Sequence, residues 1–148
     1  MYTVRDLEQY LSEAQANFQL IKQDRPIHAA QDAKRYYDIE KSAPTFILQN
    51  ENGLLACIIS INRGRLDFEA MKRQFCFSKL KMADRRKVEK LIGYNVGAIP
   101  LIGHDLTCIF DDSLLKHDYI YGGTGDELVT LKIKPEDVKR LNNVILSY

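Results

Sequence analysis

The sequence has no tryptophan, four prolines and only three cysteines in 148 residues. The cysteines, Cys57, Cys76 and Cys108, are widely spaced and lie in predicted strands, so we expect buried free thiols rather than disulfides. No C-x-x-C or H-x-x-x-H spacing occurs, which argues against a zinc site. P-loop and dinucleotide-binding motifs are absent as well. The sequence therefore predicts neither a metal nor a cofactor.

Long apolar runs are also missing. No stretch of about 18 apolar residues exists, so we expect no membrane span. Residues 1–6 carry no signal-peptide pattern, and a cytoplasmic protein is expected. The content of 45% apolar and 28% charged residues is ordinary for a globular protein. The length fits a single domain over residues 1–148, and nothing in it predicts the oligomeric state.

The net charge is only +1, but the charges are unevenly distributed. Residues 71–90 carry eight cationic side chains against two acids, whereas residues 91–130 carry one lysine against six acids. A run of like charges is most often a solvated surface. The alternative is a binding surface for a phosphate backbone.

The pattern of residues predicts interleaved helices and strands. The Asn52-Gly53 pair predicts a hairpin turn between two apolar strands, which we expect to be central and covered on both faces. Thr3 and Asp84 are expected helix caps, and Gly93 is expected at a helix C-terminus. Helices are predicted over residues 4–14, 26–37, 67–74, 84–92 and 135–142, and strands over 18–21, 45–48, 54–61, 76–80, 106–110, 118–121 and 128–133. The hairpin excludes a purely parallel sheet.

Residues 93–104 hold three glycines and a proline between a predicted helix and a predicted strand. Glycine allows close approach of a ligand to the backbone, and loops on a rigid scaffold often carry function. A tight connection and a binding loop are both compatible with this composition. A second glycine cluster, residues 122–125, is predicted to form a hairpin turn.

Four segments together resemble the YbaK/ProX family of aminoacyl-tRNA deacylases, which are related to the editing domain of bacterial prolyl-tRNA synthetases. They are Pro44–Leu48, Gly93–Ile99, Ile109–Asp111 and Gly122–Gly123, and the resemblance runs from about Pro26 to Asn142. It implies an α+β fold with a mixed, mostly antiparallel, barrel-like sheet and helices packed outside. It further implies hydrolysis of the ester between a wrong amino acid and the 3′ end of a tRNA, without a metal. The implied partners are aminoacyl-tRNA and an aminoacyl-tRNA synthetase.

The resemblance also suggests site residues. In this family, backbone amides of the glycine loop hold the 3′ adenosine and polarise the ester carbonyl, a role that preorganised donors suit. The implied catalytic residues are Gly97, Ala98, Ile99, Asp111 and Lys41. The implied substrate-binding residues are His28, Pro44, Thr45, Gly93, Pro100, Gly103, His104, Tyr121, Gly122 and Gly123. Tyr36, Tyr37, Tyr119 and Tyr121 are either stacking platforms for a base or ordinary packing residues.

Two positions depart from the family pattern. Many members carry a lysine just before the threonine of the first long strand, where this chain has Pro44, and Lys41 is the nearest lysine. The usual loop reads Gly-Gly-Ile-Ser-Pro, whereas Pro100 here lies one place early. Two hypotheses follow: a trans-editing hydrolase, or a module that binds an aminoacyl-adenosine or nucleotide-like ligand without turnover. Asp111 could position water or bond a loop amide, and His104 and His28 could be ligand contacts or ordinary satisfied histidines.

Overall fold

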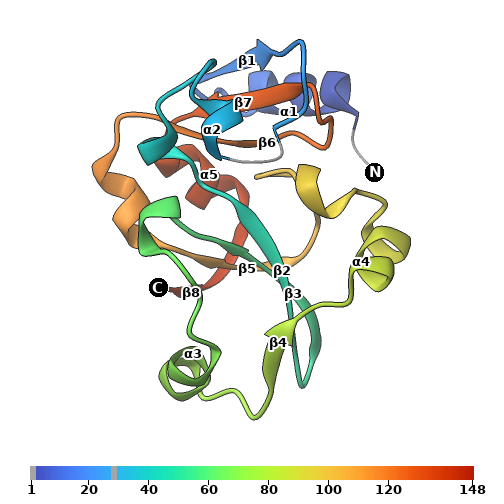
Figure 1. The fold of residues 1–148 in the computed structure, drawn as a ribbon, viewed down its shortest axis with the longest axis vertical. Coiled ribbons are helices and arrows are strands. Elements are labelled where there is room, and N and C mark those ends of the chain that lie inside the picture. The colour runs from blue at the N-terminus through green and yellow to red at the C-terminus, as the bar shows by residue number, and fades with distance from the viewer. Residues whose placement is uncertain (1–2, 28–29) are drawn as a thin grey trace.

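The computed structural model of the protein describes residues 3–27 and 30–148, whose strands form two open sheets (Figure 1). The smaller sheet has the order β1-β7-β6 and is antiparallel. The larger has the order β4-β2-β3-β5-β8, in which β5 pairs in parallel with both β3 and β8. The strands are β1 (Phe18–Lys22), β2 (Thr45–Asn50), β3 (Gly53–Ile58), β4 (Leu80–Met82), β5 (Thr107–Phe110), β6 (Ile120–Gly123), β7 (Val129–Ile133) and β8 (Asn143–Ser147).

Helices lie around these sheets, and the predicted α+β, mostly antiparallel architecture is confirmed, although neither sheet closes into a barrel. The α-helices are α1 (Val4–Glu13), α2 (Ala30–Ala33), α3 (Phe68–Phe75), α4 (Arg85–Ile92) and α5 (Pro135–Leu141). Short 3-10 turns are η1 (Ile39–Lys41), η2 (Ile61–Arg63), η3 (Val96–Ala98) and η4 (Asp112–Lys116). No helix in the described ranges is both long and apolar enough to cross a membrane.

The β2–β3 hairpin separates two hydrophobic clusters, as its continuous apolar sequence predicts. Successive side chains of a strand point to opposite faces. Ile47 and Ile58 therefore pack into one cluster, while Leu48 and Leu55 pack into the other. All four side chains are at most 5% exposed. Burial of an aliphatic side chain contributes about 1.5–3 kcal/mol, so this hairpin anchors the larger sheet.

The predicted helix caps are confirmed. The Thr3 hydroxyl accepts from the Asp6 amide at 3.1 Å, and the Asp6 carboxylate accepts from the Thr3 amide at 3.0 Å. Asp84 accepts from the Lys87 amide at 3.1 Å at the start of α4. Gly93 ends α4 with φ of 78°, a conformation that glycine adopts without strain. Local sequence thus fixes where α1 and α4 begin.

Two segments differ from their predicted structure, and one strand was missed. Of the helix expected over residues 26–37, the described residues show only α2, and hydrogen bonds from the Tyr36 and Tyr37 amides to the Ala33 carbonyl close a turn after it. The strand expected over 76–80 begins only at Leu80, and Cys76 is exposed at the left-handed end of α3, with φ of 58°. Strand β8 was not predicted, since its parallel pairing with β5 is a non-local interaction.

The two glycine clusters meet where the smaller sheet approaches the larger one. Gly122 and Gly123 lie inside β6, opposite Leu131 and Thr130, rather than in the predicted turn. Pro100 forms an isolated parallel bridge with Gly123, and the Leu101 amide donates to the Gly123 carbonyl at 3.1 Å. The chain after η3 therefore runs beside β6, which brings distant segments of the sequence together.

Candidate functional site

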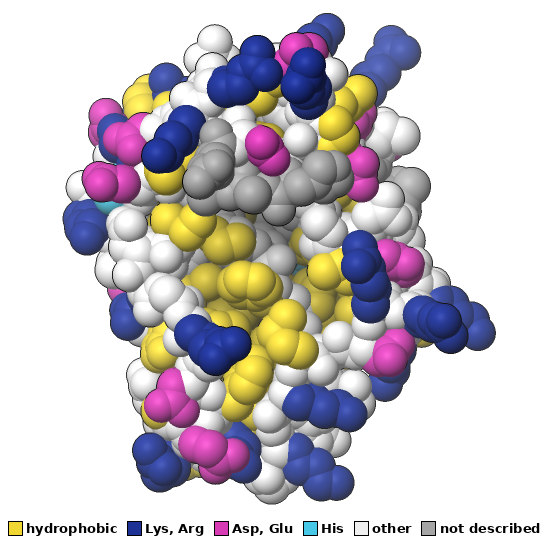
Figure 2. Space-filling model, in the orientation of Figure 1, with side chains coloured by type: hydrophobic (Ala, Val, Ile, Leu, Met, Phe, Trp, Pro, Cys, Tyr) yellow, Lys and Arg dark blue, Asp and Glu magenta, His cyan; other side chains and the backbone are white. Residues whose placement is uncertain are grey.

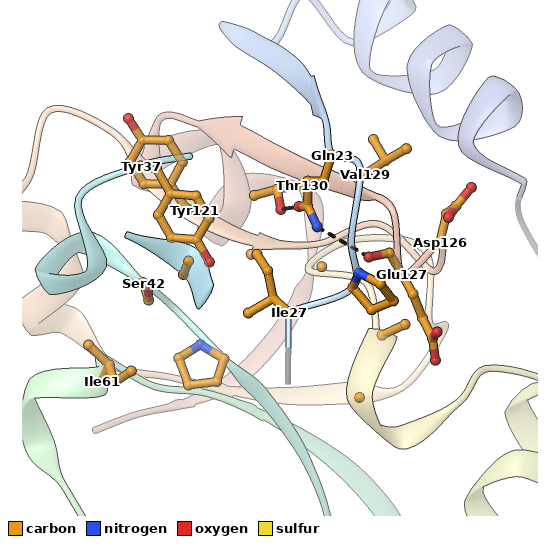
Figure 3. A pocket seen from close by; sticks show the side chains of 17 residues that line it. Gln23, Ile27, Tyr37, Ser42, Ile61, Tyr121, Asp126, Glu127, Val129 and Thr130 are labelled. Carbon is orange, nitrogen blue, oxygen red and sulfur yellow. Dashed lines mark hydrogen bonds between the residues drawn. The ribbon is translucent and has the colours of Figure 1, made fainter. Parts of the chain in front are cut away.

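A cavity of about 280 Å³ lies where β6 and β7 face η3 and the segment before β2. Figure 2 shows apolar side chains gathered around a hollow in the middle of this face of the molecule. The side chains that line the cavity come from five separate segments (Figure 3). They are Gln23, Pro26, Ile27, Ala33, Tyr37, Ser42, Pro44, Ile61, Gly97, Ala98, Tyr121, Gly122, Gly123, Asp126, Glu127, Val129 and Thr130. A cavity of this size suits a small ligand group.

Six of the residues implied by the resemblance line this cavity. They are Pro44, Gly97, Ala98, Tyr121, Gly122 and Gly123. The glycine loop and the second glycine cluster therefore form walls of one cavity, although 25 positions separate Gly97 from Gly122. The described residues contain no group of three or more His, Cys, Asp or Glu side chains placed to hold a metal.

Gly97 has no structural need to be glycine. Its φ is not positive, and a Cβ built on it would meet no atom within 4 Å beyond its chain neighbours. The opposite holds for Gly123, whose Cβ would lie 2.2 Å from the Ile99 carbonyl oxygen, and for Gly122, whose Cβ would lie 2.5 Å from the Leu101 side chain. A Cβ on the exposed Gly97 would thus meet open space, whereas β6 needs its glycines for packing.

The amides of the glycine loop differ in availability. The Ala98 amide donates to the Asn95 carbonyl at 2.9 Å, so it is already used within the turn. The Gly97 amide makes no hydrogen bond within the described part of the chain, as expected for the first residues of a helical turn. Of these two amides, Gly97 is the one that can serve a ligand.

Tyr37 and Tyr121 form one wall of the cavity (Figure 3). Their rings stack with centroids 4.5 Å apart and an angle of 8° between planes. Burial raises the pKa of Tyr37 above its ordinary value, and a hydrogen bond with Ser42 acts in the opposite direction. Because the two rings already stack on each other, they form a rigid apolar surface.

Gln23 and Thr130 form the polar part of the cavity. The Gln23 amide group donates to the Arg25 carbonyl at 3.0 Å and to the Glu127 carbonyl at 3.3 Å. The Thr130 hydroxyl donates to the Gln23 side-chain oxygen. Gln23 is 8% exposed and Thr130 5% exposed, so this network fixes the ends of β1 and β7 against each other.

Asp111 lies away from the lining and is fully buried. Its carboxylate accepts two hydrogen bonds from the Arg63 guanidinium, at 2.7 and 2.9 Å, and others from the Ser60 and Ser113 amides, at 2.9 and 3.0 Å. Burial alone would raise the pKa of Asp111, but the bonds from Arg63 and the two amides lower it below the ordinary value. Through these bonds the Asp111 carboxylate joins η2 and η4 to the sheet. They correspond to the second of the two expected roles of Asp111, which were to position water or to bond a loop amide.

His104, Gly103 and Gly93 also lie outside the lining of this cavity. Gly103 and His104 border two other hollows, beside Asp105 and Leu106. The Nδ1 atom of His104 accepts from the Leu106 amide at 3.1 Å, and burial lowers the pKa of this histidine. His104 therefore stabilises the turn before β5. Gly93 is the C-cap of α4.

The remaining implied residues surround the cavity without lining it. Lys41 pairs with Asp118 at 2.9 Å, and this hydrogen bond raises the lysine's pKa. Ile99 and Pro100 are buried between η3 and β6, and Thr45 opens β2 with a buried hydroxyl that has no partner in the described ranges. His28 lies outside the described residues.

The lining also contains residues that the sequence did not indicate. They include Gln23, Ile61, Glu127 and Thr130. Beyond the six residues implied by the resemblance, the sequence indicates only Tyr37, as a stacking or packing residue. Gln23 and Thr130 meet because β1 pairs antiparallel with β7, with Ile21 opposite Thr130. No local pattern in the sequence indicates that pairing.

A family model for the aminoacyl-tRNA editing domain matches residues 24–141 of the chain. The protein belongs to the aminoacyl-tRNA editing domain family. This finding confirms the resemblance drawn from the glycine segments. The match spans every segment that lines the cavity except Gln23.

Solved structures show the same fold. A crystal structure of a hypothetical protein has a TM-score of 0.81 at 21% identity, covering 95% of this chain and 96% of that one. A proposed trans-editing enzyme for prolyl tRNA synthetase has a TM-score of 0.79 at 18% identity, covering 97% and 94%. A protein from Marinobacter aquaeolei VT8, described in terms of signal transduction, has a TM-score of 0.66 at 19% identity, covering 100% and 30%. At these identities the likeness establishes the fold alone.

Proposed function

We propose that this protein hydrolyses the ester between a wrongly attached amino acid and the 3′ end of a tRNA, as a free-standing trans-editing deacylase in the cytoplasm. Membership of the editing domain family supports the substrate class. The observation that carries the proposal is Gly97, which borders the cavity and has neither a positive φ nor a crowding neighbour to explain it. A residue that the fold leaves without a side chain beside a cavity makes room for a ligand.

In the proposed reaction, the ester carbonyl lies against the Gly97 amide. Water adds to the carbonyl carbon, the carbon–oxygen bond to the ribose breaks, and the products are a free amino acid and a tRNA hydroxyl. Negative charge develops on the carbonyl oxygen during this addition. A fixed backbone N–H stabilises that charge without having to reorient during the reaction.

The cavity supports a small, apolar aminoacyl side chain. Apolar side chains surround its interior, including Ile27, Pro44 and Val129. In an apolar pocket, one methylene more or less on the substrate changes the free energy of transition-state binding by about 1–3 kcal/mol. Larger amino acids are therefore rejected by the size and shape of the cavity.

The rest of the tRNA is proposed to lie along α4, which leads directly into η3. The first turn of α4 holds Arg85, Arg86 and Lys87 and no acid, although cations at a helix N-terminus are unfavourable. Arg85 pairs with Glu89, while Arg86 and Lys87 are exposed without an ion pair in the described structure. Figure 2 shows lysine and arginine side chains along the flank where Figure 1 places β4 and α4. Phosphates would offset this unfavourable clustering of charge.

A binding module without turnover is the second candidate, and a specific observation favours it. Pro44 lines the cavity at the position where many family members carry lysine, and no lysine or arginine belongs to the described lining. Lys41, the nearest lysine in the sequence, lies outside the lining and pairs with Asp118.

A panel of tRNAs charged with small amino acids tests the first candidate. The proposal expects deacylation above the spontaneous rate for at least one of them; no acceleration on any would overturn it. A non-hydrolysable aminoacyl-adenosine analogue separates the two candidates. A rise in melting temperature with no turnover supports the binding module, because a ligand that binds only the folded state stabilises it. Addition of a prolyl-tRNA synthetase to the assay tests the proposed synthetase partner through a change in rate.

A further inference from the structure

The charged residues of the cavity lining all have the same sign. Asp126 and Glu127, on the turn between β6 and β7, are its only charged residues among those the structure describes. Neither carboxylate forms an ion pair with a described residue. The mouth of the cavity therefore attracts cations and repels anions.

The two carboxylates differ in what they already bind. Asp126 accepts from the Leu128 amide at 2.8 Å, which holds it in the turn, and Figure 3 shows its side chain directed away from the cavity. The Glu127 carboxylate accepts no hydrogen bond from the described residues. Glu127 and Gly97 both line the cavity. Glu127 is thus the acidic group of the lining whose carboxylate has no hydrogen-bond partner among the described residues.

Gln23 and Thr130 offer no free hydrogen-bond donor to the cavity. Both hydrogens of the Gln23 amide go to backbone carbonyls, and the Thr130 hydroxyl donates to Gln23. What Gln23 and Thr130 leave free are acceptor lone pairs. A carboxylate or phosphate would find no donor on these two side chains, whereas an ammonium group would find acceptors there and an unpaired carboxylate on Glu127.

We propose that Glu127 binds the α-ammonium group of the aminoacyl moiety and thereby selects aminoacyl esters over uncharged acyl esters at this site. The proposal rests on the deacylase or binding role above, since the ammonium lies on the carbon next to the ester carbonyl. In the proposed complex the carbonyl lies at Gly97 and the carbon that bears the ammonium is oriented toward Glu127, which lines the same cavity. The ammonium then enters the acidic mouth while the phosphates remain on the basic flank of α4. Glu127 acts as a specificity-determining residue and takes no part in bond breaking.

The test compares the best aminoacyl-tRNA of the panel with its α-hydroxy counterpart, in which a hydroxyl of similar size replaces the amino group. Each rate is divided by the spontaneous rate, because the two esters differ in intrinsic lability. The wild type is expected to prefer the aminoacyl ester roughly threefold, the effect of one ion pair at an exposed carboxylate. Glu127→Gln is expected to remove most of that preference, because it slows hydrolysis of the aminoacyl ester more than hydrolysis of the hydroxy ester.

Asp126→Asn is the matched control, since it removes the same charge from the same turn and is expected to keep most of the preference. Equal treatment of the two esters by the wild type would overturn the inference and leave the deacylase role intact. A preference unchanged in Glu127→Gln would overturn it as well. If no ester is hydrolysed, the deacylase role fails, and binding of amino and hydroxy forms of the non-hydrolysable adenosine analogue tests Glu127 by the same ratio.

Discussion

The cavity has two walls that contain glycine, and they lack side chains for different reasons. On the β6 wall, Gly122 and Gly123 are pressed against Leu101 and the Ile99 carbonyl, so the fold itself excludes a Cβ. On the η3 wall, Gly97 faces open space, and the fold would accept a Cβ there. The comparison shows that glycine can occur in a family motif for two reasons. Gly122 and Gly123 allow close packing within the fold, whereas Gly97 is proposed to leave room for a ligand.

Gly123→Ala gives the largest expected effect on the fold. The new Cβ would need the Ile99 backbone to move, because it starts 2.2 Å from that carbonyl oxygen. We expect a loss of about 3 kcal/mol in the free energy of unfolding, measured by urea denaturation. Gly122→Ala is the companion variant and should cost less, about 1–2 kcal/mol, since it meets a side chain rather than backbone. Equal stability of Gly123→Ala and wild type would refute the packing role of this wall.

Asp111→Asn should come next, with an effect on stability and little on activity. Removing the charge leaves Arg63 without its partner and weakens the bonds from two amides; we expect a loss of about 2–3 kcal/mol, because Arg63 remains partly exposed. A loss of turnover at unchanged stability would instead place Asp111 in the chemistry.

The same variant makes a prediction for pH. The pKa of Asp111 lies below its ordinary value of 3.8 in the folded state, so its carboxylate stabilises the fold at neutral pH. That stabilisation is lost as the pH falls below the unfolded value and through the folded one. Urea denaturation of the wild type should therefore show a steeper loss of stability below about pH 4 than Asp111→Asn.

Neutralising Arg86 and Lys87 gives the smallest expected effect, and it should differ between activity and stability. Arg86→Gln with Lys87→Gln should weaken tRNA binding at low salt by roughly threefold for each cation that contacts a phosphate. Helix α4 should become slightly more stable, by about 0.3–1 kcal/mol, because two cations leave its N-terminus. Kinetics on aminoacyl-adenosine, which lacks the tRNA duplex, provide the control and should not change. A variant that binds tRNA as the wild type does would show that this flank is only a solvated surface.

Much of the fold could be read from short-range patterns. Asn52-Gly53 marks the β2–β3 hairpin, and Asp84 and Gly93 mark the ends of α4, because turns and caps depend on a few neighbouring residues. Interactions between segments distant in the chain could not be predicted from the sequence. Gly122 and Gly123 were expected in a turn, since nothing in the sequence shows that residues 99–101 run beside them.

The candidate site was predictable in part for the same reason. The motif resemblance led to Pro44, Gly97 and Gly123, which the cavity brings together. Gln23 and Glu127 carry no motif and reach the cavity only through the pairing of β7 with β1 and β6. Asp111 and His104 are candidates by residue type; both are buried outside the cavity lining, where the Asp111 carboxylate and the His104 Nδ1 atom accept hydrogen bonds from the scaffold.

The most direct test of the account is Gly97→Ala, assayed for deacylation of the panel's best aminoacyl-tRNA and for its unfolding free energy. Stability should equal or exceed that of the wild type by up to about 1 kcal/mol, since a Cβ fits and the unfolded chain loses freedom. Activity should fall by at least roughly tenfold, because the methyl group occupies the space that the ester needs. Full activity in a stable Gly97→Ala protein would contradict the claim that this glycine makes room for the substrate.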